Sequence, residues 1–256
     1  MGTALITGAT AGLGLEFAWQ LATARHDLVL VARDAERLER VAGQLHAAAG
    51  VHVEVLPADL SVRDDVERVA ERLRGTTHPV GLLVNNAGLA LHQRFVGGDL
   101  QREEAAFGVM VRAVMVLSHA AAAQMTARGR GAILNVSSVA ALTASGTYSA
   151  HKAWVRSFTE GLAVELAGTG VSATALCPGF VHTEFHERAS LDMTAFPEVA
   201  WLHADDVVAT ALADVRRGVV ISTPSVRYRV LSGVVRVLPR SVVRRVGSHR
   251  PGARGR

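Results

Sequence analysis

Lysine is almost absent from this chain of 256 residues. The sequence holds one lysine, Lys152, and two tyrosines, Tyr148 and Tyr228, whereas arginine supplies nearly all of its positive charge. Arginine cannot replace a compact ammonium where the geometry demands a point charge, so a single retained lysine indicates a specific task. Lys152 lies four residues after Tyr148, and side chains at that spacing share one face of a helix. The pair therefore predicts a site where a phenol and an ammonium meet one ligand.

A neighbouring cation favours the ionised form of a phenol. We therefore expect the pKa of Tyr148 to lie below its ordinary value of about 10, so that its hydroxyl serves as an acid or base near neutral pH. The alternative is that Tyr148 and Lys152 lie together by an accident of composition on an ordinary amphipathic helix. The remainder of the sequence favours the first interpretation.

Cysteine and long apolar runs are also scarce or missing. Cys177 is the sole cysteine, so no disulfide can form within the chain, which fits a reducing cytosol. We find no run of about 18 apolar residues and expect no membrane-spanning helix. The first residues are typical of a strand followed by glycine rather than of a signal peptide. An apolar fraction of 49% with 20% charged residues indicates a globular protein, which we expect to be cytoplasmic.

Acidic residues are missing from the last stretch, Arg227 to Arg256, which holds nine of the 27 basic residues. The other 18 basic residues stand against 23 acidic ones, so residues 1–226 are net negative although the whole chain carries +4. One helical face of this stretch is apolar, with Leu231, Val234, Val235 and Leu238. A solvated terminus, or a helix that packs on the domain or across a subunit contact, explains the pattern. Peripheral attachment to an anionic membrane is the alternative, and we expect no nucleic-acid binding.

Glycine is concentrated in one turn, Thr7-Gly8-Ala9-Thr10-Ala11-Gly12-Leu13-Gly14. Glycines let the backbone turn tightly and approach a pyrophosphate, which then lies at the positive end of the following helix. Many glycine-rich turns bind nothing, so the turn alone is a weak signal. The apolar strand before it and the helical pattern after it strengthen the prediction of a dinucleotide site.

The next strand, residues 28–32, ends at Arg33-Asp34. In dinucleotide-binding folds an acid at the end of this strand holds the ribose hydroxyls, whereas an arginine accommodates a 2′-phosphate. Arg33 follows the strand directly, so we favour NADP over NAD. A surface Arg–Asp pair is the alternative, and Asp34 also suits the N-cap of a helix over residues 35–49.

Strands and helices alternate along the chain with short connections. This alternation predicts a mostly parallel sheet covered by helices on both faces. Polar residues stand at the carboxyl ends of two strands, where open α/β sheets bind ligands, although Asn-Asn is also a turn former. These residues are Asn85, Asn86, Ser137 and Ser138. The expected strands cover residues 3–7, 28–32, 51–56, 80–84, 132–136, 171–176 and 219–222, and the expected helices about 15–22, 35–49, 63–74, 100–127, 148–167 and 205–216.

With these residues placed, residues 2–223 resemble the short-chain dehydrogenase/reductase family, most of all its NADP-using reductases of apolar ketones. The motifs that carry the resemblance occur in the family's order: Thr7 to Gly14, Asn85 to Gly88, Ser138, Tyr148-xxx-Lys152, and Pro178 to Thr183. The resemblance implies one α/β, doubly wound Rossmann domain, residues 1–224, with a seven-stranded, mostly parallel sheet flanked by helices. A basic helix and tail, residues 225–256, would follow. The family commonly forms homo-dimers or homo-tetramers.

The resemblance also implies an activity, namely NADP-dependent hydride transfer between nicotinamide and a secondary alcohol or ketone. Ser138 would donate a hydrogen bond to the substrate oxygen, Tyr148 would exchange its proton, and Lys152 would hold the nicotinamide ribose. The apolar segment 181–202, which folds over the substrate in this family, favours an apolar substrate. The implied cofactor-binding positions are Gly8, Thr10, Gly12, Leu13, Gly14, Arg33, Asp59, Leu60, Asn86, Ala87, Gly88, Tyr148, Lys152, Pro178, Gly179, Val181 and Thr183.

Two positions depart from the family pattern. Met110 stands where the family carries an asparagine that holds a water of the proton relay. Ser138 and Tyr148 are ten residues apart, which is closer than usual, so Ser137 is an alternative to Ser138. These departures motivate a second hypothesis, an NADP(H)-binding protein with little catalysis, and an epimerase or lyase is a third. His182 and His186 have the spacing of helical metal ligands but no third ligand, so we expect no metal.

Overall fold

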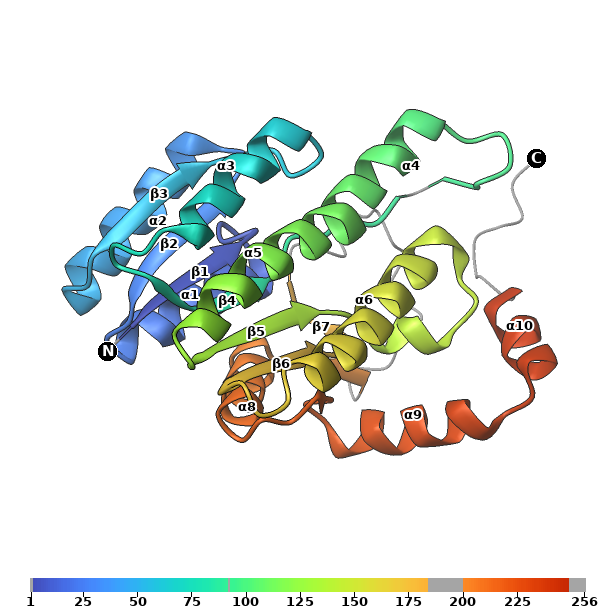
Figure 1. The fold of residues 1–256 in the computed structure, drawn as a ribbon. Helices are drawn as coiled ribbons and strands as arrows, with labels where there is room; N and C mark the ends of the chain where they lie inside the picture. Colours follow the sequence, from blue (N-terminus) through green and yellow to red (C-terminus); the bar gives the residue numbers. More distant parts are fainter. Residues whose placement is uncertain (1, 92, 184–199, 249–256) are drawn as a thin grey trace.

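Seven strands form one sheet through the centre of the molecule, in the order β3-β2-β1-β4-β5-β6-β9, and every neighbouring pair is parallel (Figure 1). The computed structural model of the chain describes residues 2–91, 93–183 and 200–248. The strands are β1 (Thr3–Thr7), β2 (Asp27–Ala32), β3 (Val53–Pro57), β4 (Val80–Asn85), β5 (Gly131–Val136), β6 (Val171–Leu176) and β9 (Ile221–Ser222). The predicted fold class is confirmed. The strand order reverses between β1 and β4, and open sheets bind ligands at such a reversal.

Helices connect the strands and cover both faces of the sheet (Figure 1). One face carries α1 (Gly12–Thr23), α2 (Ala35–Ala49) and α8 (Ala204–Arg216). The other carries α3 (Arg63–Arg74), α5 (Ala113–Ala127) and α6 (Gly146–Glu165). Because both faces are covered, the central strands carry apolar residues at successive positions and not only at alternate ones, as in Ala4-Leu5-Ile6 of β1 and residues 28–31 of β2.

The hydrophobic core has two layers, one on each side of the sheet. Alternate residues of β1 point to opposite layers: Ala4 and Ile6 pack with α1, α2 and α8, whereas Leu5 packs with α3 and α5. The residues of β2 alternate in the same way. This packing fixes the register of the central strands, and so places their carboxyl ends together at one edge of the sheet.

Local signals set the boundaries of α2, which spans the predicted residues. The carboxylate of Asp34 accepts a hydrogen bond from the backbone N–H of Arg37 at 2.9 Å and so caps the first turn. Gly50 ends the helix with φ of +64°, a left-handed conformation that favours glycine. The alternative role of Asp34 as an N-cap is therefore confirmed.

A single long helical stretch, Leu100–Ala127, crosses one face of the sheet. It comprises α4 (Leu100–Phe107), a π-helical turn η1 (Gly108–Arg112) and α5. The stretch has 28 residues, and the mean hydropathy of its most apolar 18 residues is 1.6, so it is long and apolar enough to cross a membrane, contrary to our expectation from the sequence. However, it packs on α3, β4 and β5, and 56% of its most apolar window is buried. A core helix passes the same test of length and composition, and this stretch is one.

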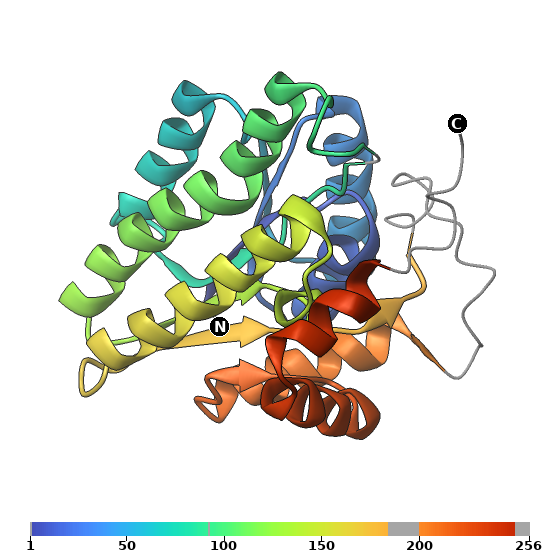
Figure 2. The ribbon, with the colours of Figure 1, turned by 90° about the vertical axis from the view of Figure 1, so that its right-hand side faces the viewer.

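Three small elements and two helices complete the described chain. η2 (Val139–Leu142) follows β5, and β7 (Phe180–Val181) pairs with β8 (Trp201–Leu202) in a small second sheet. α9 (Val226–Val237) and α10 (Arg240–Ser248) lie at the periphery of the domain (Figures 1 and 2). Pro239 separates these two helices, as its lack of a backbone N–H predicts.

Candidate active site

The glycine-rich turn after β1 is bonded to the loop after β4. The hydroxyl of Thr7 accepts hydrogen bonds from the backbone N–H groups of Asn86 and Ala87, both at 3.0 Å. The side-chain amide of Asn86 donates to the carbonyl of Thr7 at 2.9 Å. These bonds join residues almost eighty positions apart into one unit, which we call the cradle: Thr7 to Gly14 together with Asn86 to Gly88.

The glycines of the first turn of the cradle, Gly8, Gly12 and Gly14, have positive φ or no room for a side chain. Gly8 and Gly12 have φ of +66° and +51°, where other residues are strained. A Cβ on Gly14 would lie 2.1 Å from the carbonyl oxygen of Gly8 and 2.5 Å from the amide nitrogen of Asn86. The turn is thus compact, and the N-terminus of α1 begins directly at Gly12. This geometry fits a pyrophosphate, which needs close backbone approach and a helix N-terminus.

Asn85, beside Asn86 in the sequence, has a different task. It is 3% exposed, and its amide donates to Ser118 at 3.1 Å and to Asn135 at 2.9 Å. Asn135 in turn donates to Thr159 at 3.0 Å. This network joins β4, β5, α5 and α6 inside the core, so Asn85 belongs to the scaffold of the site. Asn135, the third asparagine of the chain, therefore also belongs to this scaffold.

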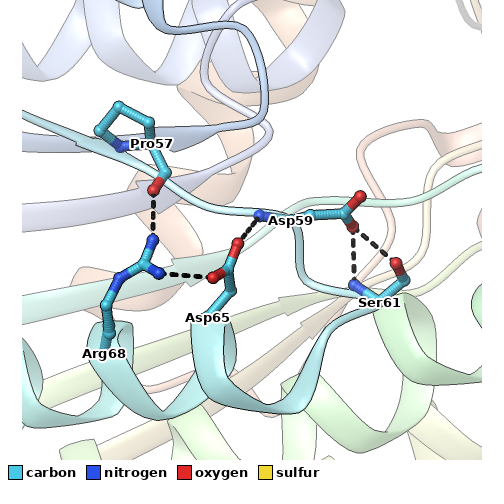
Figure 3. A network of polar contacts seen from close by, with 5 residues as sticks. All are labelled: Pro57, Asp59, Ser61, Asp65 and Arg68. Carbon is cyan, nitrogen blue, oxygen red and sulfur yellow. Dashed lines mark hydrogen bonds and ion pairs between the residues drawn. The ribbon is translucent and has the colours of Figure 1, made fainter.

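A polar network orders the connection from β3 to α3, which holds the predicted cofactor position Asp59 (Figure 3). Asp59 accepts hydrogen bonds from the backbone and hydroxyl of Ser61 at 2.9 and 2.7 Å, and its own N–H donates to Asp65 at 2.7 Å. Asp65 pairs with Arg68, which also donates to the carbonyl of Pro57.

The carboxylate of Asp59 is held in its ionised form. Burial alone raises its pKa, but the hydrogen bonds from Ser61 and the charge of Arg33 outweigh burial, and the pKa is lowered. The guanidinium of Arg33, at the end of β2, is exposed. The two predicted positions therefore lie near one another at adjacent strand ends.

Tyr148 and Lys152 share one face of the first turns of α6, as their spacing predicts. The Lys152 ammonium lies 5.8 Å from the centre of the Tyr148 ring. It is 4% exposed, and it donates a hydrogen bond to the carbonyl of Val136 at 2.8 Å. A Cβ on Gly88 would lie 3.5 Å from the ammonium nitrogen, so the ammonium borders the cradle. The ammonium therefore lies inside the protein beside the cradle and does not point into solvent.

Burial raises the pKa of Tyr148 to about 12, against a hydrogen bond with Ser138 that lowers it. Our prediction of a lowered pKa is wrong. The cause is the burial of the phenol itself, which disfavours its ionised form. Burial acts on the neighbouring cation too, and lowers the pKa of Lys152 to about 8. Spacing along a helix shows that two groups meet, but it does not show how much water surrounds them.

The two serines after β5, Ser137 and Ser138, have different hydrogen-bond partners. The hydroxyl of Ser137 is buried and donates to the backbone carbonyl of Lys152 at 2.7 Å, so it helps to hold α6. Ser138 caps η2 by accepting from the N–H of Ala140 at 3.1 Å, and it is hydrogen-bonded to Tyr148. The geometry therefore favours Ser138 over Ser137 as the partner of the phenol.

Met110 lies in the π-helical turn, 2% exposed, beside the cradle: its Cγ would be 4.0 Å from a Cβ on Gly88. The thioether is at most a weak acceptor, so this position supplies an apolar wall where the family pattern has an amide.

The segment Pro178 to Thr183 follows β6 and lies against the cradle. A Cβ on Gly12 would be 3.2 Å from the Cβ of Thr183, which places that threonine beside the turn. The backbone carbonyl of Pro178 accepts from Val139 at 3.0 Å. Val181 is buried among the residues packed on α1 and α8. The other predicted positions lie close by: Thr10 and Leu13 are half-buried in the turn, and Leu60 is buried next to Asp59. His186 lies outside the described residues.

Tyr228 is a residue at the site that the sequence analysis did not find. It lies on α9, and its hydroxyl accepts from the N–H of Phe180 at 3.2 Å and donates to the carbonyl of Ala200 at 2.6 Å. Its ring occupies the space where Gly179 lacks a side chain, since a Cβ there would lie 2.0 Å from Cζ. We had explained Gly179 by the cofactor, but Tyr228 also requires it. The scarcity of tyrosine was the only available signal.

Comparison with known proteins agrees with this geometry. The model of the short chain dehydrogenase family matches residues 2–194. An uncharacterized oxidoreductase of Staphylococcus saprophyticus is 34% identical over 206 residues, which cover 77% of this chain and 88% of that protein. The chain belongs to the short-chain dehydrogenase family, and it is an alcohol or ketone oxidoreductase.

Three solved structures share the fold over most of the chain. A short-chain dehydrogenase from Sphingobium yanoikuyae in complex with NADPH has a TM-score of 0.83 and 34% identity, covering 100% of this chain and 99% of its own. A bulky-bulky ketone specific alcohol dehydrogenase from Comamonas testosteroni has a TM-score of 0.80 and 28% identity, covering 100% and 97%. A relative from Burkholderia phymatum in complex with NAD has a TM-score of 0.80 and 27% identity, covering 92% of both chains.

Proposed function

We propose that the protein is an NADPH-dependent reductase of apolar ketones, with Tyr148 as the proton donor. The observation that carries this proposal is the group formed by Ser138, Tyr148 and Lys152 at the edge of a cradle whose glycines admit a dinucleotide. The bound cofactor would supply the hydride, and the chain would supply binding, orientation and the proton.

Each residue of the group has a defined part in carbonyl reduction. Ser138 donates a hydrogen bond to the substrate oxygen and aligns the carbonyl. Tyr148 gives its proton to that oxygen as the carbonyl carbon accepts the hydride. Because burial raises the pKa of Tyr148 to about 12, the phenol keeps its proton at neutral pH, which suits an acid in the reductive direction. Lys152 stabilises the resulting phenolate by its charge.

Arg33 supports NADP over NAD. Its exposed guanidinium stands at the end of β2, where the 2′-phosphate of NADP lies in dinucleotide-binding folds. The similar structure that contains NADPH agrees with this choice, although another relative holds NAD. Arg33→Ala should lower the ratio of kcat/KM for NADPH to that for NADH at least about tenfold. Arg40→Ala, which removes an exposed arginine from α2, is the matched control and should leave the ratio unchanged.

Aromatic rings flank the segment 184–199 on both sides and support an apolar substrate. His182 stacks on Trp201 with ring centres 4.6 Å apart, and Phe180 lies 5.8 Å from the same ring. A similar protein is specific for bulky ketones. The aromatic residues within the segment, Phe185 and Phe196, lie outside the described residues.

Spectrophotometry tests the proposal directly. Purified enzyme is mixed with NADPH and a series of ketones of rising size and hydrophobicity, and the loss of absorbance of NADPH is followed. We expect turnover that falls by roughly 10²- to 10⁴-fold in Tyr148→Phe, the range typical of general acids. Turnover equal to that of the variant across the whole series would refute the proposal.

A second candidate function is tight NADP(H) binding with little catalysis. Met110 favours it, because a buried thioether replaces the amide expected in the proton relay. Calorimetry with NADPH separates the two: micromolar binding without turnover on any ketone supports the second candidate, whereas turnover supports the first.

We also propose that the chain forms a homo-oligomer. Three apolar side chains on the surface of α4, α5 and α6 support this: Phe107, Met115 and Val164 are 49%, 46% and 76% exposed. Light scattering after gel filtration gives the mass, and a monomer at micromolar concentration would contradict the proposal.

A further inference from the structure

The helix α9 packs on the domain through a narrow stripe. Tyr228 is 8% exposed, and Ser232 and Val235 are half-buried. These residues are four and three positions apart, which places them on one side of the helix. This stripe holds α9 beside η2 and the Pro178–Thr183 segment.

The opposite side of α9 is apolar and faces outward. Val226, Val230, Val234 and Val237 follow one another at helical spacing and are 65%, 63%, 49% and 82% exposed. From the sequence we expected the apolar side of this helix at Leu231, Val234, Val235 and Leu238, packed on the domain or on a subunit, with membrane attachment as the alternative. Of these four residues only Val235 is half-buried, and the other three are exposed. In an isolated soluble domain the outer face of a terminal helix is polar, so this valine face indicates a surface that a partner covers.

The charged side chains of α9 and α10 themselves have a single sign. From Val226 to Ser248 the chain holds six arginines and no acidic residue. They are Arg227, Arg229, Arg236, Arg240, Arg244 and Arg245, and all six are exposed. A basic polar side next to an outward apolar side is the pattern of a helix that lies in a membrane interface.

We propose that α9 and α10 bind an anionic lipid surface. The valine face would enter the boundary between head groups and acyl chains, while the arginines beside it would contact lipid phosphates. This inference concerns the surface alone and does not depend on the proposed reductase activity.

A second copy of the chain fits this face less well than lipid does. In a symmetric contact the same patch meets itself, so the arginines of one chain would lie against those of the other. No acidic residue of Val226–Ser248 is present to offset their repulsion. An anionic lipid surface presents the complementary charge, and it tolerates the apolar side.

Co-sedimentation with vesicles tests the proposal with the full-length protein. One set of vesicles is phosphatidylcholine, and the other contains about one third phosphatidylglycerol. We expect binding to the anionic set, weakened strongly at about 0.5 M NaCl because salt screens exposed charges. Arg227→Gln/Arg229→Gln should weaken binding on the order of 30-fold, since each arginine near an anionic surface contributes about fivefold.

A second variant tests how much the valine face contributes to vesicle binding. Val230→Ser/Val237→Ser should weaken binding at least about tenfold, because two exposed side chains lose their transfer into the interface. Val96→Ser is the matched control: this valine is 84% exposed and belongs to the loop before α4, not to α9 or α10, so binding should not change. Circular dichroism of every variant verifies folding.

Three results would overturn the proposal. The first is no sedimentation with anionic vesicles, and the second is equal binding to both vesicle types. The third is a dimer in analytical ultracentrifugation that dissociates in Val230→Ser/Val237→Ser without any lipid binding by the unchanged protein, which would assign the valine face to a second copy.

Discussion

The cradle and the Pro178–Thr183 segment line the same end of the sheet, but different contacts hold them. In the cradle, Thr7 and Asn86 tie one backbone segment to another, and a Cβ on Gly14 would collide with the backbone of Gly8. The Pro178–Thr183 segment is bonded through its backbone to η2 and β8, and it is also bonded to the side chain of Tyr228, from a helix 48 positions later in the chain. The difference teaches that the C-terminal helix contributes a tie to one side of the site, whereas the cradle is tied within itself.

Gly14→Ala should disrupt the cradle, and we expect it to have the largest effect of the variants on cofactor binding. The new Cβ would lie 2.1 Å from the carbonyl oxygen of Gly8, a backbone atom that cannot move aside cheaply. A displaced cradle backbone would lose hydrogen bonds to the pyrophosphate, each worth about 1.5–3 kcal/mol to a charged group, so with two such bonds lost we expect NADPH affinity to fall on the order of 100-fold. Calorimetric titration measures it. Gly43→Ala on α2, where a Cβ meets no atom within 4 Å, is the control and should bind NADPH normally. Equal affinity in both variants would contradict the account of the cradle.

The same contrast explains how much the sequence could predict. Apolar runs predicted the buried parallel strands because both faces of the sheet are covered, and Asp34 and Gly50 marked the ends of α2. The cradle was predictable because a backbone that needs positive φ and close contacts selects glycine. The grouping of Tyr148 with Lys152 followed from helical spacing.

Other features could not be predicted because they depend on distant parts of the chain. The tie from Tyr228 to Phe180 and Ala200 joins residues with no shared local pattern. The pKa of Tyr148 moves in the direction opposite to our prediction, since the degree of burial is set by the whole fold. The outward turn of the valine face on α9 likewise depends on which side of that helix meets the domain.

Lys152 lies between the two regions, and its removal should separate stability from function. Burial lowers the pKa of Lys152 to about 8 from 10.5 in the unfolded chain, so the charged form is destabilised by folding at neutral pH. Lys152→Met removes that cost and loses one hydrogen bond to Val136. We expect a free energy of unfolding about 2 kcal/mol higher at pH 7, together with loss of activity.

The size of this effect changes with pH in a defined window. Between pH 8 and 10.5 the unfolded chain binds the lysine proton more strongly than the folded one, so the unchanged protein gains stability as pH rises. The advantage of Lys152→Met should therefore shrink across that window. Tyr148, whose pKa is raised to about 12, destabilises the fold only as pH rises from 10 towards 12, and it does so in both proteins. Urea titrations at pH 7, 9 and 10.5 measure the difference, and a constant gap would contradict the assigned pKa of Lys152.

Tyr228→Phe should give the smallest effect, and it tests the Pro178–Thr183 segment without disturbing the cradle. The ring still fills the space at Gly179, but the hydroxyl that joins Phe180 to Ala200 is lost. We expect about 1 kcal/mol lower stability from the lost hydrogen bonds. The KM for ketone should rise several-fold while the affinity for NADPH stays within about twofold, since the cradle has its own ties. If Tyr228→Phe bound NADPH as weakly as Gly14→Ala, the cradle and the Pro178–Thr183 segment would form one unit. A tie that acts only on the Pro178–Thr183 segment leaves the pyrophosphate end of the site unchanged.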